Sequence, residues 1–311
     1  MSRYTSALSG SLGSGDAQPN NNSLRQWIYW LGSQTHIYMS GLLHHFIGFQ
    51  SSSDIGPSFD SAISSHRISE YSTSEKVYRF DSGRVLKRSL KQDEYKIGGN
   101  GERLIPTRVV ERLKNETACM KFVREHTNIP VPKVLDAYEE NGCYYLSMEF
   151  IKGTEMSKLS CEQQTQVIPQ STYNSPFRSF WVKHWCKLVR DFITILQELR
   201  SNITGGPSGI LSPPSIVYFD HLSEWEQQRS TNEDFVFCHG DLSQGNILVD
   251  PETLKVVAII DWEYGGFFPP KNEIPFYESS DSSGEQLRSD KHKPIVDSII
   301  DFWKRSQVSA A

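Results

Sequence analysis

The sequence predicts an α+β fold of two lobes, a small one built on an antiparallel sheet and a larger, mainly helical one. At 311 residues the chain exceeds the size of about 250–300 residues at which single cores stop growing. Short runs rich in β-branched and aromatic residues dominate residues 77–151. Apolar residues at helical spacing dominate residues 177–200 and 294–305.

The small lobe, which we place at residues 71–151, should start from a hairpin. Residues 77–80 and 84–88 are two strand-like runs, and the Asp81-Ser82-Gly83 sequence between them is typical of a turn. Lys87 lies near the end of the second run. Taken alone, a lysine at a strand end is usually solvated, so Lys87 needs a partner to be significant.

Residues 108–126 are predicted to form a helix that supplies this partner, because its apolar residues recur at steps of three, four and seven. Glu116 falls at the centre of that apolar stripe. A carboxylate on a buried face is costly unless it is paired, and Lys87 is the economical partner. Two alternatives stay open: the helix could lie shallow, with Glu116 in water, or Lys96 could take the place of Lys87.

The most informative motif is His-Gly-Asp-Leu-Ser-Gln-Gly-Asn at residues 239–246, followed by Ile-Ile-Asp-Trp at 259–262. It supplies Asp241, Asn246 and Asp261. Residues 246–249 and 256–260 are apolar strands joined by turn chemistry at residues 250–253. An antiparallel hairpin would therefore bring Asp261 back beside Asn246, with Asp241 just before it.

This constellation suits phosphoryl transfer from ATP. One carboxylate can orient and deprotonate a hydroxyl, while an amide oxygen and a second carboxylate hold magnesium. Magnesium is a hard cation that prefers such oxygen ligands. The alternative is that the His–Asp pair is only structural, since His-x-Asp alone is common.

The motifs resemble those of the aminoglycoside phosphotransferase and choline kinase family, which has a bilobal protein-kinase-like fold. The resemblance covers about residues 75–275. The phrasing V-F-C-H-G-D-L-S-Q-G-N and A-I-I-D-W-E-Y-G-G most resembles fungal members. Asp-Trp-Glu stands where protein kinases have Asp-Phe-Gly, which is closer to choline kinases.

The resemblance implies roles for individual residues. Asp241 would be catalytic, Asn246 and Asp261 would bind Mg²⁺, Lys87 would hold the ATP phosphates, and Glu116 would position Lys87. The family's interlobe hinge falls on three further residues, whose backbone would bind adenine: Glu149, Phe150 and Ile151. His239 would brace the loop without transferring a proton.

Two segments near these residues have competing interpretations. The turn at residues 72–74 lies where the family has its nucleotide-covering loop, but a plain turn is the simpler interpretation. Trp262, Tyr264, Phe267 and Phe268 could line a pocket for a cationic acceptor or simply pack the large lobe. Gly98-Gly99-Asn100-Gly101 is no phosphate loop, because no Walker pattern follows it.

Composition narrows the cellular setting. The net charge of −5 predicts no nucleic-acid partner, and five cysteines without metal-ligand spacing indicate a reducing, cytoplasmic compartment.

Residues 1–23 are Ser/Gly/Asn-rich and predicted to be disordered. Residues 24–70 should be a helical extension. Its uncharged part, residues 26–53, is interrupted too often by polar residues for a membrane span.

The large lobe, residues 152–311, should end in the helix at 294–305, preceded by a polar, mobile tail at residues 278–292. We expect ATP- and Mg²⁺-dependent phosphoryl transfer to a small-molecule hydroxyl. The sequence does not identify the acceptor. The alternative is a catalytically weak or inactive nucleotide-binding scaffold of the same fold.

Overall fold

The computed structural model describes residues 69–81, 83–99, 101–158, 176–212, 226–279, 281–288 and 290–308, and the side chains of all of these except 69, 176–184 and 304–308. The predicted disordered segment 1–23 and nearly all of the predicted extension 24–70 lie outside these ranges. The predicted boundaries at residues 23, 70 and 151 stay predictions.

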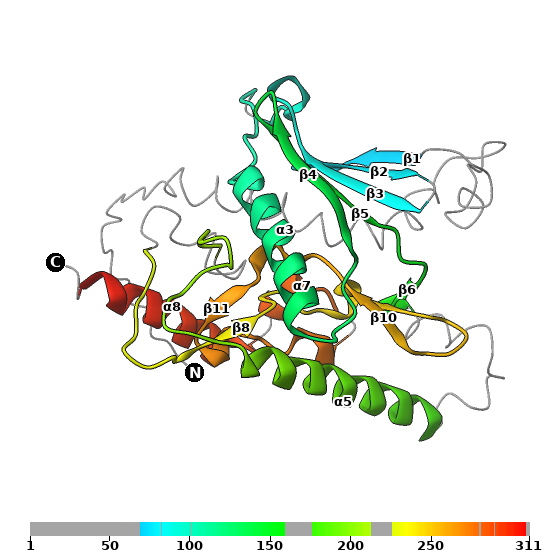
Figure 1. Ribbon diagram of the computed structural model, residues 1–311, viewed down its shortest axis with the longest axis vertical. Helices are drawn as coiled ribbons and strands as arrows, with labels where there is room; N and C mark the ends of the chain where they lie inside the picture. The colour runs from blue at the N-terminus through cyan, green and yellow to red at the C-terminus, as the bar shows by residue number, and fades with distance from the viewer. Residues whose placement is uncertain are drawn as a thin grey trace, which may run out of the picture.

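A five-stranded antiparallel sheet with the order β1-β2-β3-β5-β4 forms the first part of the described chain (Figure 1). Its strands are β1 (Ser69–Ser72), β2 (Lys76–Asp81), β3 (Arg84–Ser89), β4 (Val134–Glu140) and β5 (Cys143–Glu149). The predicted hairpin is confirmed, since β2 pairs with β3 across a turn in which Gly83 has a φ of 79°. A short 3-10 helix, η1 (Gln92–Glu94), follows β3.

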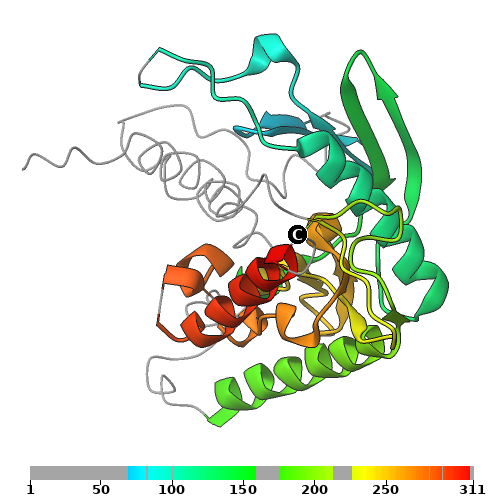
Figure 2. The same ribbon diagram turned by 90° about the vertical axis from the view of Figure 1, so that its left-hand side faces the viewer.

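Helix α3 (Val109–His126) confirms the helix predicted from the apolar spacing. Val109, Leu113, Met120 and Val123 are all buried. In Figures 1 and 2, α3 runs from the five-stranded sheet down into the rest of the molecule. The helix contacts β3, β4 and β5 as well as η4 (Trp262–Tyr264), so it joins the two parts of the described chain.

The second part holds two small antiparallel sheets, with the orders β10-β9-β6 and β11-β8-β7. Their strands are β6 (Thr154–Glu155), β7 (Arg200–Ser201), β8 (Phe235–Cys238), β9 (Ile247–Val249), β10 (Val256–Ile259) and β11 (Gly266–Phe268). The helices are α5 (Pro176–Glu198), α7 (Ser283–Arg288) and α8 (Lys293–Val308), with short 3-10 turns η3 (Gln244–Asn246), η5 (Pro270–Asn272) and η6 (Phe276–Glu278). Helices α5 and α8 confirm the predicted helices at 177–200 and 294–305.

One continuous hydrophobic core connects these parts. It contains Met120 and Val123 from α3, Leu146 from β5, Phe237 from β8 and Trp262. A second cluster lies beneath α8 and includes Phe268, Ile299 and Trp303. Within the described ranges, no helix is long and apolar enough to cross a membrane.

The prediction of a mobile tail at residues 278–292 is wrong for its described part. Ser283, Gln286 and His292 are buried, and residues 283–288 form α7. The Gln286 side chain donates hydrogen bonds to the carbonyls of Phe276 at 2.8 Å and Asp281 at 2.9 Å. Polar side chains anchored to distant backbone in this way leave no hydropathy signal, which is why the sequence pattern misled.

Candidate active site

Lys87 lies at the centre of a buried ion-pair cluster. Its Nζ donates to Glu116 Oε1 at 2.6 Å and to Asp261 Oδ1 at 2.9 Å. The predicted ion pair with Glu116 is therefore present, and the alternative with Glu116 in water is wrong because its side chain is 0% exposed. Burial alone would lower the pKa of Lys87, but Asp261 and Glu116 together raise it well above its ordinary value. The lysine is thus held as a cation.

Lys96 does not compete for this place. It is exposed, and its carbonyl accepts from the Leu104 amide at 2.8 Å. Its region is an irregular loop with a single bridge between Ile97 and Arg103. Among the described residues, no ion pair joins Lys96 to Glu116.

Asp241 and Asn246 come together in the loop that follows β8. Asp241 is 5% exposed, and Asn246 Nδ2 donates to the Asp241 carbonyl at 2.7 Å. The same amide nitrogen lies 3.5 Å from Asp241 Oδ2. With its nitrogen turned to Asp241, the Asn246 amide leaves its oxygen for another ligand.

The predicted hairpin brings Asp261 to the same end as Asn246. In the β9–β10 register, Ile247 lies opposite Ile259, and the Ile260 amide donates to the Asn246 carbonyl at 3.0 Å. Asp261 follows directly in the left-handed conformation, with φ 66° and ψ 55°. This conformation is uncommon outside glycine and is best tolerated by Asn and Asp. The Asp261 side chain is 29% exposed, so a ligand can reach it.

His239 braces this end of the hairpin. Its Nε2 lies 3.0 Å from the Ile260 carbonyl, and its Nδ1 lies 3.3 Å from the Asp241 amide. Burial lowers the pKa of His239 to about 4. The neutral ring therefore donates from Nε2 and accepts at Nδ1, which leaves no ring nitrogen for proton transfer. These contacts agree with the bracing role expected for His239.

Gly240 explains why the motif has glycine between His239 and Asp241. Its φ is 80°, and a Cβ there would lie 2.7 Å from the Tyr264 carbonyl oxygen. A side chain would both strain the backbone and push η4 away. The loop is further fixed by Glu273, whose carboxylate accepts from the backbone amides of His239 and Gly240. Nothing in the sequence around Glu273 indicates this role.

The Asp241 carboxyl group is electrostatically unusual. Its pKa is raised to about 8, chiefly by burial, and the carboxylates of Asp261 and Glu263 raise it further. A hydrogen bond from the Ser283 side chain opposes this shift. Ser283 is the residue of α7 that sequence analysis placed in a mobile tail. In the unliganded protein near neutral pH, Asp241 is therefore largely protonated.

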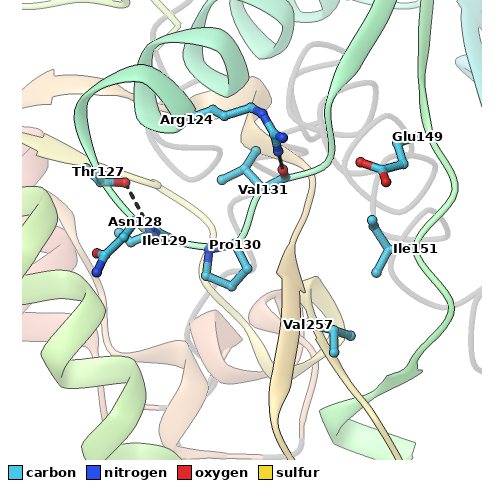
Figure 3. Close-up of a pocket in the computed structure, with 9 residues that line it drawn as sticks. All are labelled: Arg124, Thr127, Asn128, Ile129, Pro130, Val131, Glu149, Ile151 and Val257. Carbon is cyan, nitrogen blue, oxygen red and sulfur yellow. Dashed lines mark hydrogen bonds between the residues drawn. The ribbon is translucent and has the colours of Figure 1, made fainter.

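The predicted hinge residues lie at the end of β5. The Glu149 and Phe150 amides donate to the carbonyls of Lys133 and Gly83, each at 2.9 Å. The Ile151 amide has no acceptor within the described part of the chain. Glu149 and Ile151 also line a cavity of about 480 Å³ near the C-terminal end of α3 (Figure 3).

That cavity is separate from the ion-pair cluster. Its lining is Arg124, Thr127, Asn128, Ile129, Pro130, Val131, Glu149, Ile151 and Val257, so Glu149 and Ile151 are the predicted site residues that it includes. Figure 3 shows Arg124 donating to the Val131 carbonyl, at 2.9 Å. The structure therefore brings the predicted phosphate and metal residues together but does not join them to the hinge in this cavity.

The turn between β1 and β2 is a plain, self-bonded turn. Thr73 Oγ1 donates to the Lys76 carbonyl at 3.0 Å and accepts from the Glu75 and Lys76 amides at 3.2 and 2.9 Å. The aromatic residues that follow Asp261 pack the interior, as the simpler interpretation held. Trp262 and Phe268 are 0% exposed and Tyr264 is 5% exposed.

Comparison with known proteins gives the family. The model of the phosphotransferase enzyme family matches residues 215–273, which contain the His239–Asn246 motif and Asp261. An aminoglycoside 3'-phosphotransferase of Streptomyces ribosidificus is 48% identical over 185 residues, covering 54% of this chain and 67% of that protein. The chain belongs to this phosphotransferase enzyme family.

Other relatives match over shorter stretches. An aminoglycoside 3'-phosphotransferase of Streptomyces fradiae is 24% identical over 169 residues, and the chain spans only 57% of its length. A probable choline kinase 3 of Arabidopsis thaliana is 40% identical over 55 residues, or 18% of this chain and 16% of that protein.

Solved structures are more distantly similar. An aminoglycoside phosphotransferase of Streptomyces rimosus in complex with ADP and streptomycin has a TM-score of 0.41 and 18% identity, covering 76% of this chain and 84% of the other. Because this TM-score lies below 0.5, the family assignment rests on the sequence relatives.

Proposed function

We propose that the protein transfers the γ-phosphoryl group of ATP to a hydroxyl of a small molecule, with magnesium as cofactor. The observation that carries the proposal is the cluster in which Lys87 contacts both Glu116 and Asp261, at 2.6 and 2.9 Å. Asn246 and Asp241 adjoin Asp261 through the β9–β10 hairpin. The relatives are aminoglycoside phosphotransferases and a probable choline kinase, which supports an acceptor of this class.

The residues present fit a magnesium ion. Asn246 turns its amide nitrogen inward to Asp241, which leaves its oxygen outward, and the Asp261 carboxylate is partly exposed. One amide oxygen and one carboxylate are the hard ligands that magnesium takes from proteins, while substrate phosphates supply others. When bound, magnesium would neutralise charge on the phosphates during transfer.

Lys87 holds the nucleotide phosphates in this proposal, and Glu116 positions Lys87. Glu116 fixes the Lys87 ammonium, and the high pKa of Lys87 keeps it charged for phosphate. The Ile151 amide is the donor to the base, because the Glu149 and Phe150 amides already donate within the protein. This assignment implies a bilobal, kinase-like arrangement, with the five-stranded sheet above the nucleotide.

Asp241 accepts the acceptor's proton. It must first lose its own, since its pKa is raised to about 8 in the free protein. Positive charge brought in beside Asp261 would lower that pKa and favour the carboxylate. The acceptor hydroxyl would then donate to Asp241 and be held for attack on the γ-phosphorus.

A second candidate is a nucleotide-binding scaffold with little turnover. The observation that favours it is the Thr73 turn, whose hydroxyl and following amides are bonded to one another. In either case we expect a cytoplasmic protein that binds no nucleic acid, as its net charge of −5 indicates.

The test is an acceptor screen with γ-labelled ATP and magnesium over amino sugars, choline and ethanolamine analogues, and sugars. Transfer predicts a labelled small molecule with the wild type and none with Asp241→Asn. A protein that binds magnesium-ATP but labels no compound would favour the scaffold. A protein that binds no nucleotide would refute both candidates.

A further inference from the structure

A second group of buried charges lies beside the Lys87 cluster and takes no part in the proposed chemistry. Lys76 Nζ donates to Glu263 Oε2. Arg112 donates to Glu263 Oε1 at 3.2 Å and to Glu75 Oε2 at 2.7 Å. The four residues are at most 8% exposed, and their two positive and two negative charges balance. We call Glu75, Lys76, Arg112 and Glu263 the second ionic layer.

We call the Lys87 cluster, with Lys87, Glu116 and Asp261, the first ionic layer. The second ionic layer takes its residues from the same three parts of the chain, which are α3, the five-stranded sheet with its β1–β2 turn, and the segment that follows β10. On α3, Arg112 lies one turn before Glu116, so both side chains share a face. In the segment that follows β10, Glu263 comes two residues after Asp261. On the sheet, Lys76 and Tyr78 share a face of β2, and Tyr78 lies opposite Lys87. Each segment thus contributes to both clusters.

The two layers differ in what a ligand would do to them. In the Lys87 cluster, the Lys87–Asp261 ion pair links the sheet directly to Asp261. Under the proposed function, magnesium would bind Asp261 and phosphate would bind Lys87. Both ligands would compete with the Lys87–Asp261 ion pair, which would therefore weaken when nucleotide binds. No side chain of the second layer is used by the ligand, so its bonds persist.

Residues 263–265 are also held to α3 by hydrogen bonds beside the second ionic layer. Asn115 Nδ2 donates to the carbonyls of Glu263 at 3.0 Å and Gly265 at 2.8 Å, and Arg112 donates to the Tyr264 hydroxyl at 3.1 Å. Breaking one partner of a buried charge network leaves the others uncompensated, so the network resists separation of its segments.

We propose that Arg112, Lys76 and Glu263 are positioning residues that keep Asp261 at its metal-binding place once ligands separate it from Lys87. The inference rests on the proposed function and deepens it. The second layer acts through Asp261 and touches no substrate atom. It also anchors the β1–β2 turn, since the backbone amides of Glu75 and Lys76 donate to the Thr73 hydroxyl.

The test measures how strongly magnesium enhances ADP binding, by calorimetry with and without the metal. Glu263→Gln removes the charge at constant shape, and Arg112→Lys keeps the charge but loses the fork that reaches both glutamates. We expect both to reduce the enhancement by about tenfold, within the range measured for coupled residues. Metal-free ADP affinity should change by less than about threefold, and the double variant should be no worse than the worse single one.

Glu94→Gln is the matched control. Glu94 is an ion-paired carboxylate beside the same sheet, bound to Arg88 at 2.6 Å, and it contacts neither layer. Glu94→Gln should leave the magnesium enhancement unchanged. If the two test variants behave like this control, the second layer has no positioning role and the inference fails.

Three further outcomes are informative. If Glu263→Gln lost the magnesium enhancement of ADP binding while Arg112→Lys kept it, Glu263 would be a direct metal ligand. That result would overturn the inference. If Glu263→Gln does not fold, Arg112→Lys and Lys76→Gln carry the test, and failure of all three to fold would show a structural role instead. A wild-type protein whose ADP binding ignores magnesium would refute the proposed function itself, before any variant is compared.

Discussion

Burial in one loop sets the protonation states of His239 and Asp241. His239 and Asp241 are both buried in one loop, yet burial lowers the pKa of the first to about 4 and raises that of the second to about 8. Burial disfavours the charged form of each, so both are driven toward neutrality. Gly240 between them permits the close approach of Tyr264. The loop therefore presents a neutral brace and a carboxyl group poised to lose a proton.

Asp241→Asn should lower turnover by roughly 10²–10⁴-fold, the range that a general base supplies. ATP affinity should change little, because Asp241 faces the acceptor and not the nucleotide in our proposal. Steady-state kinetics with an identified acceptor, together with direct ATP titration, measure the two effects. Unchanged turnover would remove Asp241 from its role.

Asp261→Ala should weaken magnesium-nucleotide binding much more than metal-free nucleotide binding. The variant loses one of two proposed metal ligands, while Lys87 keeps its bond to Glu116 at 2.6 Å. Calorimetry with and without magnesium separates the two affinities. Equal losses in both conditions would show that Asp261 is only structural.

Glu273 should make stability depend on pH. Burial raises its pKa from 4.5 to about 7, so between these values the folded protein holds a proton that the unfolded chain has lost. The wild type therefore loses stability as pH rises through this window, and the loss is complete above the folded pKa.

Glu273→Gln keeps an acceptor for the His239 and Gly240 amides but cannot titrate. From pH 5 to pH 8, the free energy of unfolding of the wild type should fall relative to that of the variant by roughly 1–3 kcal/mol. Urea denaturation at both pH values measures this difference. Parallel pH profiles for the two proteins would contradict the prediction.

At the scale of elements, α3 and the β2–β3 and β9–β10 hairpins carry the site, and these are the elements that sequence predicted well. Each has a local periodic signal: helical spacing around Glu116, or short strands on either side of a turn. The position of Glu116 on the buried stripe even predicted its partner Lys87. Local sequence patterns therefore predicted the elements on which Lys87, Glu116 and Asp261 lie.

Lys87 and Glu116 should be energetically coupled in magnesium-ATP binding. Removing Lys87 leaves Glu116 buried without its cation, and removing Glu116 leaves Lys87 paired with Asp261 alone, so the double change should cost less than the sum of the single ones. A cycle of Lys87→Met and Glu116→Gln should give a coupling of about 0.5–3 kcal/mol. Lys96→Met is the control, since Lys96 is exposed and forms no ion pair with Glu116. Additive effects for Lys87, or coupling for Lys96, would overturn the placement of the phosphate lysine.

At the scale of the whole molecule, the interactions that sequence analysis missed all join distant segments. Arg112 and Glu263 are 151 residues apart, and His239 and Glu273 are 34 apart. Neither contact has a periodic signature. The same holds for Ser283, whose polar surroundings suggested a mobile tail although tertiary contacts bury it. Such contacts depend on how elements pack, which single-sequence patterns do not encode.

Packing also decided between interpretations that the sequence left open. From the sequence alone, the aromatic residues after Asp261 are as compatible with an acceptor pocket as with a core, but in the structure η4 packs against α3. There, Trp262 lies in the same core as Met120 and Phe237. Trp262, Tyr264 and Phe268 are buried and therefore closed to an acceptor, whereas Phe267 is partly buried.

The most direct test of the central claim is ADP formation from ATP, followed side by side for the wild type and Asp241→Asn with and without magnesium. The account predicts ADP formation by the wild type only when magnesium is present, and a rate roughly 10²–10⁴-fold lower for the variant. It predicts that both proteins bind magnesium-ATP. Equal ADP formation by the two proteins, or formation that ignores magnesium, would contradict the assignment of this site as a phosphotransferase centre.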